Sequence, residues 1–181
     1  MITEKEAIAL LKKYSCSKKS FDIILRHSKL VQKQSLKIAD DIIRNKHKVD
    51  KNFIKVACIL HDIGRFECPI KSDKAVLHGI IGSKILRKEG LNKIALVAER
   101  HLGAGISKED IKNQKLDLPL KDYIPATIEE KIITHADNLI FGDKVGTIKM
   151  VVERYRRELG EDVAKKMIKL NDEIEKLRGK S

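Results

Sequence analysis

Residues 53–64 read Phe-Ile-Lys-Val-Ala-Cys-Ile-Leu-His-Asp-Ile-Gly, an apolar run that ends in two side chains of metal-ligand type. Apolar residues recur at helical spacing before that pair, at Phe53, Val56, Ala57 and Leu60. This spacing predicts a helix with one buried face, which Asp50 could cap at its start. Consecutive helical residues point about 100° apart, so His61 and Asp62 could hold one ion from two sides, or Asp62 could reach a second. Gly64 fits a helix end and leaves room for a substrate to come close.

The segments on both sides of this stretch also carry helical patterns. The predicted helices cover about residues 3–13, 20–44, 50–60, 73–85, 91–101 and 127–140, with a short helix and loops over 107–125 and two charged helices from residue 144 that break near Gly160. No segment shows the sustained alternation of polar and apolar residues that is typical of a strand. The sequence therefore predicts an all-α fold in one domain.

Besides Asp50, residues at the starts of three other predicted helices are of the types that cap a helix. Thr3 with Glu6, and Thr127 with Glu130, have the spacing of a capping box. Asp73 precedes another apolar pattern and could cap the helix that follows it.

The composition excludes several classes of protein. Hydrophobic residues make up 42% and charged residues 35% of the 181 residues, which is the balance of a soluble globular protein. No apolar run reaches the ~20 residues that cross a bilayer, and the charged first residues lack the apolar core of a signal peptide. Cys16, Cys58 and Cys68 are an odd number without metal-type spacing, so we expect no disulfide scaffold and a cytoplasmic location.

The chain is basic, with a formal net charge of +12 at pH 7. Such a balance favours anionic partners, among them nucleotides, nucleic acids and other phosphates, although a lysine-rich soluble surface explains it equally well. Aromatic residues make up only 4% of the chain and tryptophan is absent, so few side chains are available to stack on single-stranded bases.

Histidines on apolar helix faces are the strongest chemical signal in the sequence. His27, His61, His78 and His101 each lie on or at the end of an apolar stripe. Burying one unpartnered imidazole costs roughly 1–3 kcal/mol, whereas a divalent metal satisfies several at once. Asp62 and Asp137 could supply carboxylate ligands to the same ion.

Two further histidines fit that ligand set less well. His135 lies two residues before Asp137, so on a helix the two side chains point about 200° apart. We interpret His135 as a supporting or structural residue. His47 lies in the plainly solvated run Asn-Lys-His-Lys.

His27, the run His61-Asp62-Ile63-Gly64 and the distant Asp137 together resemble the HD superfamily of metal-dependent phosphohydrolases, in its HDIG form. The resemblance spans about residues 20–142 and implies a single HD-type helical bundle over residues 1–181, with a C-terminal helical extension over 143–181. Two further histidines between the pair and Asp137, His78 and His101, form a pattern similar to that of enzymes that split diadenosine tetraphosphate symmetrically and of uncharacterised HDIG proteins of similar length. The Gly-Tyr-Pro signature of the cyclic-dinucleotide branch is absent from the sequence.

The resemblance also implies a ligand set. His27, His61, Asp62 and Asp137 hold one divalent ion in such proteins, and His78 with His101 stand where some members hold a second, with Asp62 as the bridge. One or two ions of Mn, Fe, Co, Ni, Zn or Mg are therefore expected.

The implied function is hydrolysis of a nucleotide or related phosphate ester by a metal-bound hydroxide, with Asp62 and Arg65 in catalytic roles. Arg65 offers an always-charged planar fork that suits phosphate, although a surface ion pair is the alternative. An RNA-associated phosphodiesterase or nucleic-acid-binding protein, and a metal-stabilised scaffold without turnover, are the competing interpretations. An oligomer through the C-terminal helices remains open.

Overall fold

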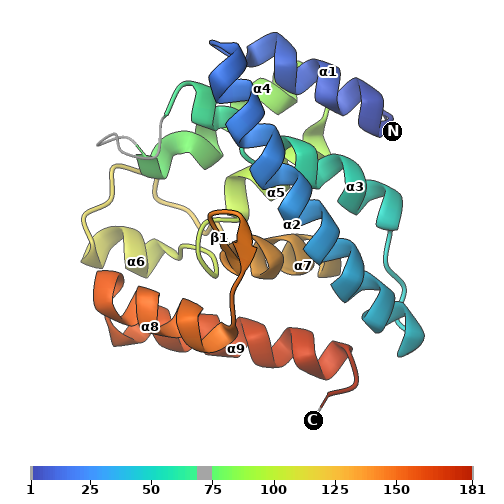
Figure 1. Ribbon diagram of the computed structural model, residues 1–181. Coiled ribbons are helices and arrows are strands. Elements are labelled where there is room, and N and C mark those ends of the chain that lie inside the picture. Colours follow the sequence, from blue (N-terminus) through green and yellow to red (C-terminus); the bar gives the residue numbers. More distant parts are fainter. Residues whose placement is uncertain (1, 69–74, 181) are drawn as a thin grey trace.

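The structure is a computed structural model that describes residues 2–68 and 75–180. Within these residues the α-helices are α1 (Glu4–Tyr14), α2 (Lys18–Arg44), α3 (Lys51–Leu60), α4 (His78–Lys88), α5 (Asn92–Arg100), α6 (Lys108–Asn113), α7 (Ile128–Asn138), α8 (Ile148–Leu159) and α9 (Glu161–Leu177) (Figure 1). Two 3-10 helices, η1 (Ile63–Phe66) and η2 (Ala75–Leu77), lie between α3 and α4 in the chain. The all-α fold class is confirmed. None of the described helices is long and apolar enough to span a membrane.

The predicted start signals are mostly confirmed. Thr3 and Glu6 form a complete capping box at α1, and the Asp50 carboxylate accepts a hydrogen bond from the Phe53 amide (2.9 Å) at α3. The Thr127 hydroxyl accepts from the Glu130 amide (3.2 Å) at α7. The box at Thr127 stays incomplete, however, because the Glu130 side chain accepts from the Ala126 amide and from Arg100 instead.

Three predicted boundaries are wrong, and two of them lie next to candidate ligands. The helix expected from Asp73 begins only at His78, preceded by η2; Asp73 itself lies outside the described residues. The helix expected to run to Ile140 ends at Asn138, because the chain reverses at Gly142 (φ +60°) and forms a hairpin. In that hairpin β1 (Ile140–Phe141) pairs antiparallel with β2 (Lys144–Val145), so the expectation of no strand was also wrong. Strands of two residues are too short to show alternation in a sequence.

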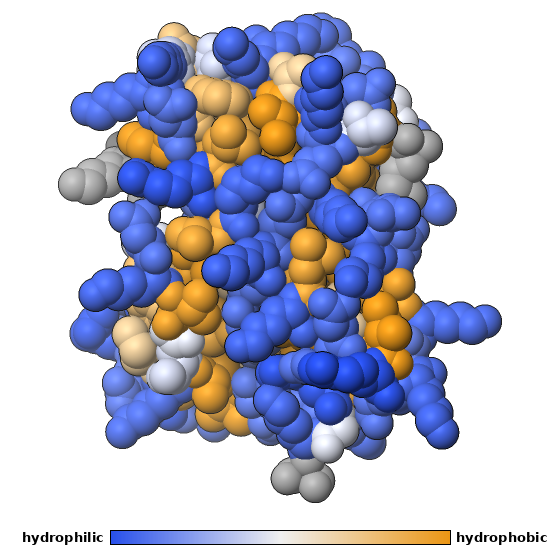
Figure 2. All heavy atoms as spheres, turned by 45° about the vertical axis from the view of Figure 1, so that its right-hand side comes forward, coloured by the Kyte–Doolittle hydropathy of each residue, from blue (hydrophilic) through white to orange (hydrophobic). Residues whose placement is uncertain are grey.

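The core lies where α2 packs against α3 and α7, with α5 behind them (Figure 1). Its buried side chains come from α1 to α5, α7 and α9 and include Val31, Ile38, Ile54, Leu60 and Ile133. The stripe on α2 that the sequence predicts, Ile24, Val31, Ile38 and Ile42, is buried throughout. The face of the molecule in Figure 2 is largely hydrophilic, with separate hydrophobic areas between charged side chains.

The C-terminal helices form a hairpin against one side of this core. The two charged helices expected from the sequence are present, but the first begins at Ile148 and not at Lys144, which lies in β2; Gly160 (φ +92°) separates α8 from α9. Leu170 and Ile174 of α9 join the main core, while Val151 of α8 packs with Met167 and Leu139 in a smaller cluster. The hairpin therefore covers the end of α7, next to Asp137.

Candidate metal centre

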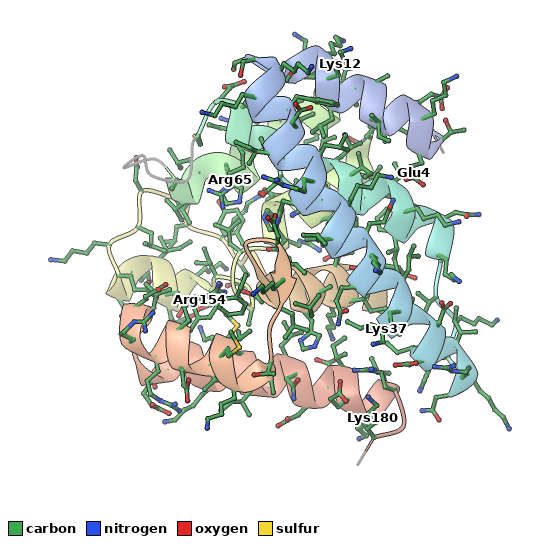
Figure 3. The ribbon with its side chains drawn as sticks, viewed as in Figure 1. Glu4, Lys12, Lys37, Arg65, Arg154 and Lys180 are labelled. Atoms are coloured by element: carbon green, nitrogen blue, oxygen red, sulfur yellow. The ribbon has the colours of Figure 1, made fainter. Side chains whose placement is uncertain are left out.

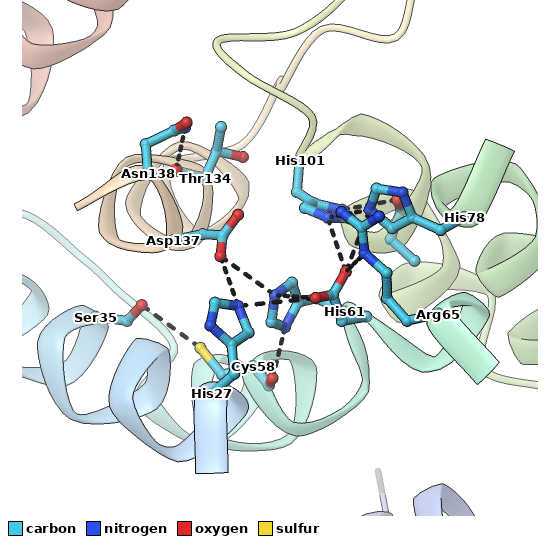
Figure 4. Close-up of polar contacts among 12 residues, drawn as sticks. His27, Ser35, Cys58, His61, Arg65, His78, His101, Thr134, Asp137 and Asn138 are labelled. Atoms are coloured by element: carbon cyan, nitrogen blue, oxygen red, sulfur yellow. Dashed lines mark hydrogen bonds and ion pairs between the residues drawn. The ribbon is translucent and has the colours of Figure 1, made fainter. Parts of the chain in front are cut away.

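Five helices bring six candidate ligands to one point (Figure 4). His61 and His101 are the residues that follow α3 and α5, Asp62 precedes η1, and His78 is the first residue of α4. His27 lies in the middle of α2 and Asp137 in the last turn of α7. Most of the set sits at helix ends, where the backbone changes direction and side chains from different helices can converge.

One group of ligand atoms forms around Asp137. Its Oδ1 lies 2.9 Å from Nε2 of His27 and 3.6 Å from Nε2 of His61. The ligand atoms of these three residues lie within 4.8 Å of one another, which is close enough for a single ion. His61 is fully buried, whereas His27 and Asp137 stay partly open to solvent.

The second group forms around Asp62. Its Oδ1 lies 3.2 Å from Nε2 of His78 and 3.4 Å from Nε2 of His101. Its Oδ2 faces the other group, at 3.7 Å from His27 and 3.9 Å from His61. Asp62 thus presents one oxygen to each side of the cluster, and its ligand atom lies within 4.8 Å of those of His61 and His101.

Backbone carbonyls fix the orientation of three of the imidazole rings. The Nδ1 atoms of His61, His78 and His101 lie 2.8, 2.6 and 2.8 Å from the carbonyl oxygens three residues earlier in the chain. A carbonyl can only accept, so each Nδ1 carries the proton and each Nε2 of a neutral ring presents its lone pair to the centre. This second hydrogen bond on the far nitrogen is typical of metal-binding histidines.

The ring nitrogens and carboxylate oxygens lie so close together that a positive charge is needed between them. Nε2 of His78 and Nε2 of His101 lie 3.0 Å apart, and both face a carboxylate oxygen of Asp62. Nε2 of His61 is buried without a hydrogen-bond partner. Lone pairs and carboxylates repel one another at these distances unless protons or cations lie between them. Imidazole and carboxylate ligands in this arrangement suit a divalent metal ion.

The shifted pKa values of Asp137, Asp62 and His61 also show that the cluster stabilises negative carboxylates next to positive charge. Burial alone would raise the pKa of Asp137, but the hydrogen bond from His27 and the nearby His61 outweigh it and hold the pKa well below its usual range. Burial likewise opposes ionisation of Asp62, and the surrounding histidines still lower its pKa. Burial disfavours a charged His61, yet Asp62 and Asp137 raise its pKa to about 9. The two carboxylates therefore stay ionised, which favours positive charge beside them.

Comparisons with known proteins agree with this geometry. The family model of the HD domain matches residues 24–142, the part of the chain that carries all six candidate ligands. The chain belongs to the HD domain family. An uncharacterized protein of Methanocaldococcus jannaschii is 40% identical over 176 residues, which cover 96% of this chain and 97% of that protein.

Other relatives of this HD domain are larger proteins. The tRNA (cytidine(56)-2'-O)-methyltransferases of Picrophilus torridus and Thermoplasma volcanium are 36% and 37% identical, over 98% and 93% of this chain. The chain spans about half the length of each, 48% and 45%. Among solved structures, the HD domain of the phosphodiesterase PgpH from L. monocytogenes has the same fold, with a TM-score of 0.55 over 96% of this chain and 97% of that one, at 17% identity.

Arg65 lies beside the HD motif, as the sequence predicts. Its Nε donates to Oδ1 of Asp62 (3.3 Å), and its Nη1 donates to the carbonyl oxygen of Ala75 (3.3 Å). Part of its donor capacity is therefore already used within the protein, although its side chain still lines the cavities beside the centre.

The two remaining histidines lie away from the centre. His135 is buried on the side of α7 that faces α9, near Glu175 and Arg178, and burial lowers its pKa to about 4. His47 is exposed, as expected from its solvated run.

Two cavities open beside the candidate metal centre of this HD domain. One, of about 720 Å³, borders His27 and Asp62; the other, of about 490 Å³, borders His78 and His101. Both also touch Arg65 and Asp137, so they meet at the ligand cluster.

Sequence reasoning missed the residues with which the C-terminal hairpin closes these cavities. Arg154, Tyr155 and Glu158 of α8 line the larger cavity, and Tyr155 and Glu158 also line the smaller one. The Tyr155 hydroxyl donates to Oδ1 of Asn138 (2.6 Å), the residue next to Asp137. No motif marks these positions, because their role depends on how α8 folds back over α7.

Proposed function

We propose that this protein is a metal-dependent phosphohydrolase acting on a phosphodiester or nucleotide-like phosphate. The observation that carries the proposal is the convergence of four Nε2 atoms and two carboxylates at the point where two cavities meet. Membership of the HD domain family, and the phosphodiesterase name of the L. monocytogenes neighbour with the same fold, support the same class of reaction.

The ligands divide into two sets that share Asp62. His27, His61 and Asp137 with Oδ2 of Asp62 would hold one ion; His78 and His101 with Oδ1 of Asp62 would hold a second. Divalent ions held by these residues would lower the pKa of bound water and offset negative charge on phosphoryl oxygens. Mn, Fe, Co, Ni, Zn and Mg all remain candidates, because availability in the cell decides among them as much as the ligands do.

The chain's own residues supply orientation and charge. Asp62 aligns the two ligand sets, and backbone hydrogen bonds hold His61, His78 and His101 in one tautomer. Arg65 presents its remaining N–H groups toward the cavities, where they can bind a phosphoryl oxygen.

The cavities support a small phosphorylated substrate. A phosphoryl group at the ligand cluster can extend one substituent into each cavity, and volumes of about 490 and 720 Å³ are the size of small-molecule sites. The wall of the smaller cavity is formed largely by apolar side chains such as Val76, Leu102 and Ile106, which suits the flat face of a nucleobase.

Elemental analysis with matched variants tests this proposal. We expect two transition-metal ions per wild-type chain, one in His78→Ala, and fewer than one in His27→Ala. Hydrolysis of bis(p-nitrophenyl) phosphate should fall by more than about 100-fold in both variants, because catalytic metal ions contribute several kcal/mol.

His47→Ala serves as the control, since this exposed histidine lies outside the cluster. It should keep both the metal content and the rate of wild type. Wild-type protein that binds no metal after exposure to Mn²⁺, Co²⁺ or Zn²⁺, or that turns over no phosphate ester when loaded, would contradict the proposal.

A second candidate function is association with RNA. It is favoured by the names of the two relatives that are tRNA methyltransferases, and by the formal charge of +12. Binding of generic RNA should then weaken steeply with salt, with a log–log slope set by the number of neutralised phosphates. Weak binding of RNA even at low salt would contradict this function and mean that the lysine-rich surface only interacts with solvent.

A further inference from the structure

The larger cavity contains an arginine that the HD motif does not include. Arg154 lies on α8, beyond the residues 24–142 that match the family model, and lines the cavity together with His27, Asp62 and Asp137. Figure 3 shows it on the side of α8 that faces the helices with the candidate ligands. The C-terminal hairpin therefore brings a positive charge to the larger cavity, which borders the centre.

Arg154 differs from the other arginines in its partners. Among the residues that the structure describes, it is the one arginine with no carboxylate oxygen within 4.0 Å. Glu158, one turn further along α8 and lining the same cavity, is bound by Arg157 instead. The charge of Arg154 is thus not neutralised within the described part of the protein.

Two aromatic rings hold the guanidinium in place. Its central carbon lies 4.7 Å from the ring centre of Phe141 on β1 and 4.8 Å from that of Tyr155 on α8. Stacking of this kind covers the faces of the guanidinium and leaves the N–H groups at its edge free to donate. Tyr155 is itself anchored by its hydrogen bond to Asn138.

Asn138 ties this platform to the ligand helix. Its side-chain amide donates to the carbonyl oxygens of Gly103 (2.7 Å) and Thr134 (2.8 Å), while its oxygen accepts from Tyr155. The position of Arg154 is therefore fixed relative to Asp137, the neighbouring residue in α7.

We propose that Arg154 binds an anionic phosphate oxygen of the substrate in the larger cavity, so that the C-terminal helices supply a binding residue that the HD motif lacks. Arg65 is less available for this role, because Asp62 and Ala75 take two of its donors. The inference rests on the proposed phosphohydrolase function, since it names a further binding residue for the same site.

Binding of inorganic phosphate to the Mn²⁺-treated protein, measured by titration calorimetry, tests the inference. We expect Arg154→Gln to weaken phosphate binding about 10- to 100-fold, the usual effect of losing a charge-assisted hydrogen bond. Arg154→Lys, which keeps the charge but not the planar fork, should fall between this variant and wild type. Metal content and the melting temperature should stay those of wild type in both variants.

Kinetics supply a second readout. With bis(p-nitrophenyl) phosphate, Arg154→Gln should raise KM by about the same factor and change kcat much less, the pattern of a lost binding contact. Arg156→Gln is the matched control: it removes the same charge from α8, at a residue that is paired with Glu161 at the surface. It should bind phosphate as wild type does.

The two proposals fail in different ways. Wild type without metal or turnover, but with phosphate binding that depends on Arg154, would refute the phosphohydrolase and keep only Arg154 as a phosphate-binding residue. Full phosphate affinity and an unchanged KM in Arg154→Gln would overturn the inference and leave the phosphohydrolase standing. Wild type that does not bind millimolar phosphate overturns it as well.

Discussion

Gly64 shows how closely the HD motif packs against its neighbours. A methyl group at this position would overlap the carbonyl oxygen of His78 and come within 2.6 Å of the backbone nitrogen of Gly82. Both of these are backbone atoms of α4, which cannot move aside as a side chain can. The glycine therefore allows η1 to lie against α4, and this contact sets the distance between Asp62 and His78.

Replacing Gly64 by alanine should therefore disturb the metal centre as well as the fold. We expect Gly64→Ala to lower the free energy of unfolding by roughly 1–3 kcal/mol, the cost of overpacking. Displacement of His78 should lower the metal content toward one ion per chain, measured by elemental analysis beside urea unfolding.

Gly90→Ala is the control for backbone strain alone. Gly90 has φ +75° with open space around it, so alanine should cost about 1 kcal/mol there and leave the metal content unchanged. Equal metal content in Gly64→Ala and wild type would show that the close approach does not position His78.

At the scale of single elements, α7 places one side chain in the ligand cluster and another against α9. Asp137 points into the ligand cluster, whereas His135, two residues earlier, is buried against α9 with only 4% of its surface exposed. The separation of about 200° that helical geometry gives these positions explains the division. Burial lowers the pKa of His135 from 6.5 to about 4, so the ring is neutral in the folded protein at neutral pH.

This shift predicts acid sensitivity with a definite sign. Between about pH 6.5 and 4 the unfolded chain binds a proton at His135 that the folded chain does not. The free energy of unfolding should therefore fall as the pH falls through this window, by roughly 3 kcal/mol in all from this residue.

Urea unfolding of the metal-free protein at a series of pH values measures this contribution. The His135→Leu variant should lose less stability than wild type between pH 6.5 and 4, since leucine does not titrate. Parallel curves for the two proteins would contradict the assignment. Other histidines contribute equally to both curves, so the difference isolates position 135.

At the scale of the whole molecule, the C-terminal hairpin and the motif-bearing helices share one core. Ile174 of α9 is fully buried in the same cluster as the side chains of α2, α3 and α7. Arg178 at the end of α9 also forms an ion pair with Asp41 of α2. A single folding unit over residues 1–181 stays a prediction, and this shared core supports it.

Ile174→Ala tests whether the hairpin and the bundle unfold together. A cavity at this position should lower the free energy of unfolding by about 2–5 kcal/mol and shift one common transition, followed by circular dichroism. Ile168→Ala on the same helix is the control, because Ile168 is 38% exposed and should cost less than about 1 kcal/mol. Two separate transitions in wild type would mean that α8 and α9 form an independent unit.

Much of the site was predictable because its residues follow local rules. The apolar run that ends in His61-Asp62, and the stripe on α2 that carries His27, can be recognised from spacing alone. The hairpin after Asn138 and the late start of α4 at His78 could not be predicted, because both depend on short backbone turns without a periodic pattern. Arg154 was missed for another reason: it follows no motif, and only the fold brings it to the cavity.

The sequence by itself determined the all-α class, the buried helix faces and the residue types that could bind metal, since these depend on periodicity and on the chemistry of each side chain. The tertiary structure alone decided that Asp62 faces both ligand sets, that His135 packs near Glu175 of α9, and that Arg154 enters the larger cavity. These outcomes depend on how helices distant in sequence pack, and packing is fixed by the shape of the whole core rather than by any local pattern.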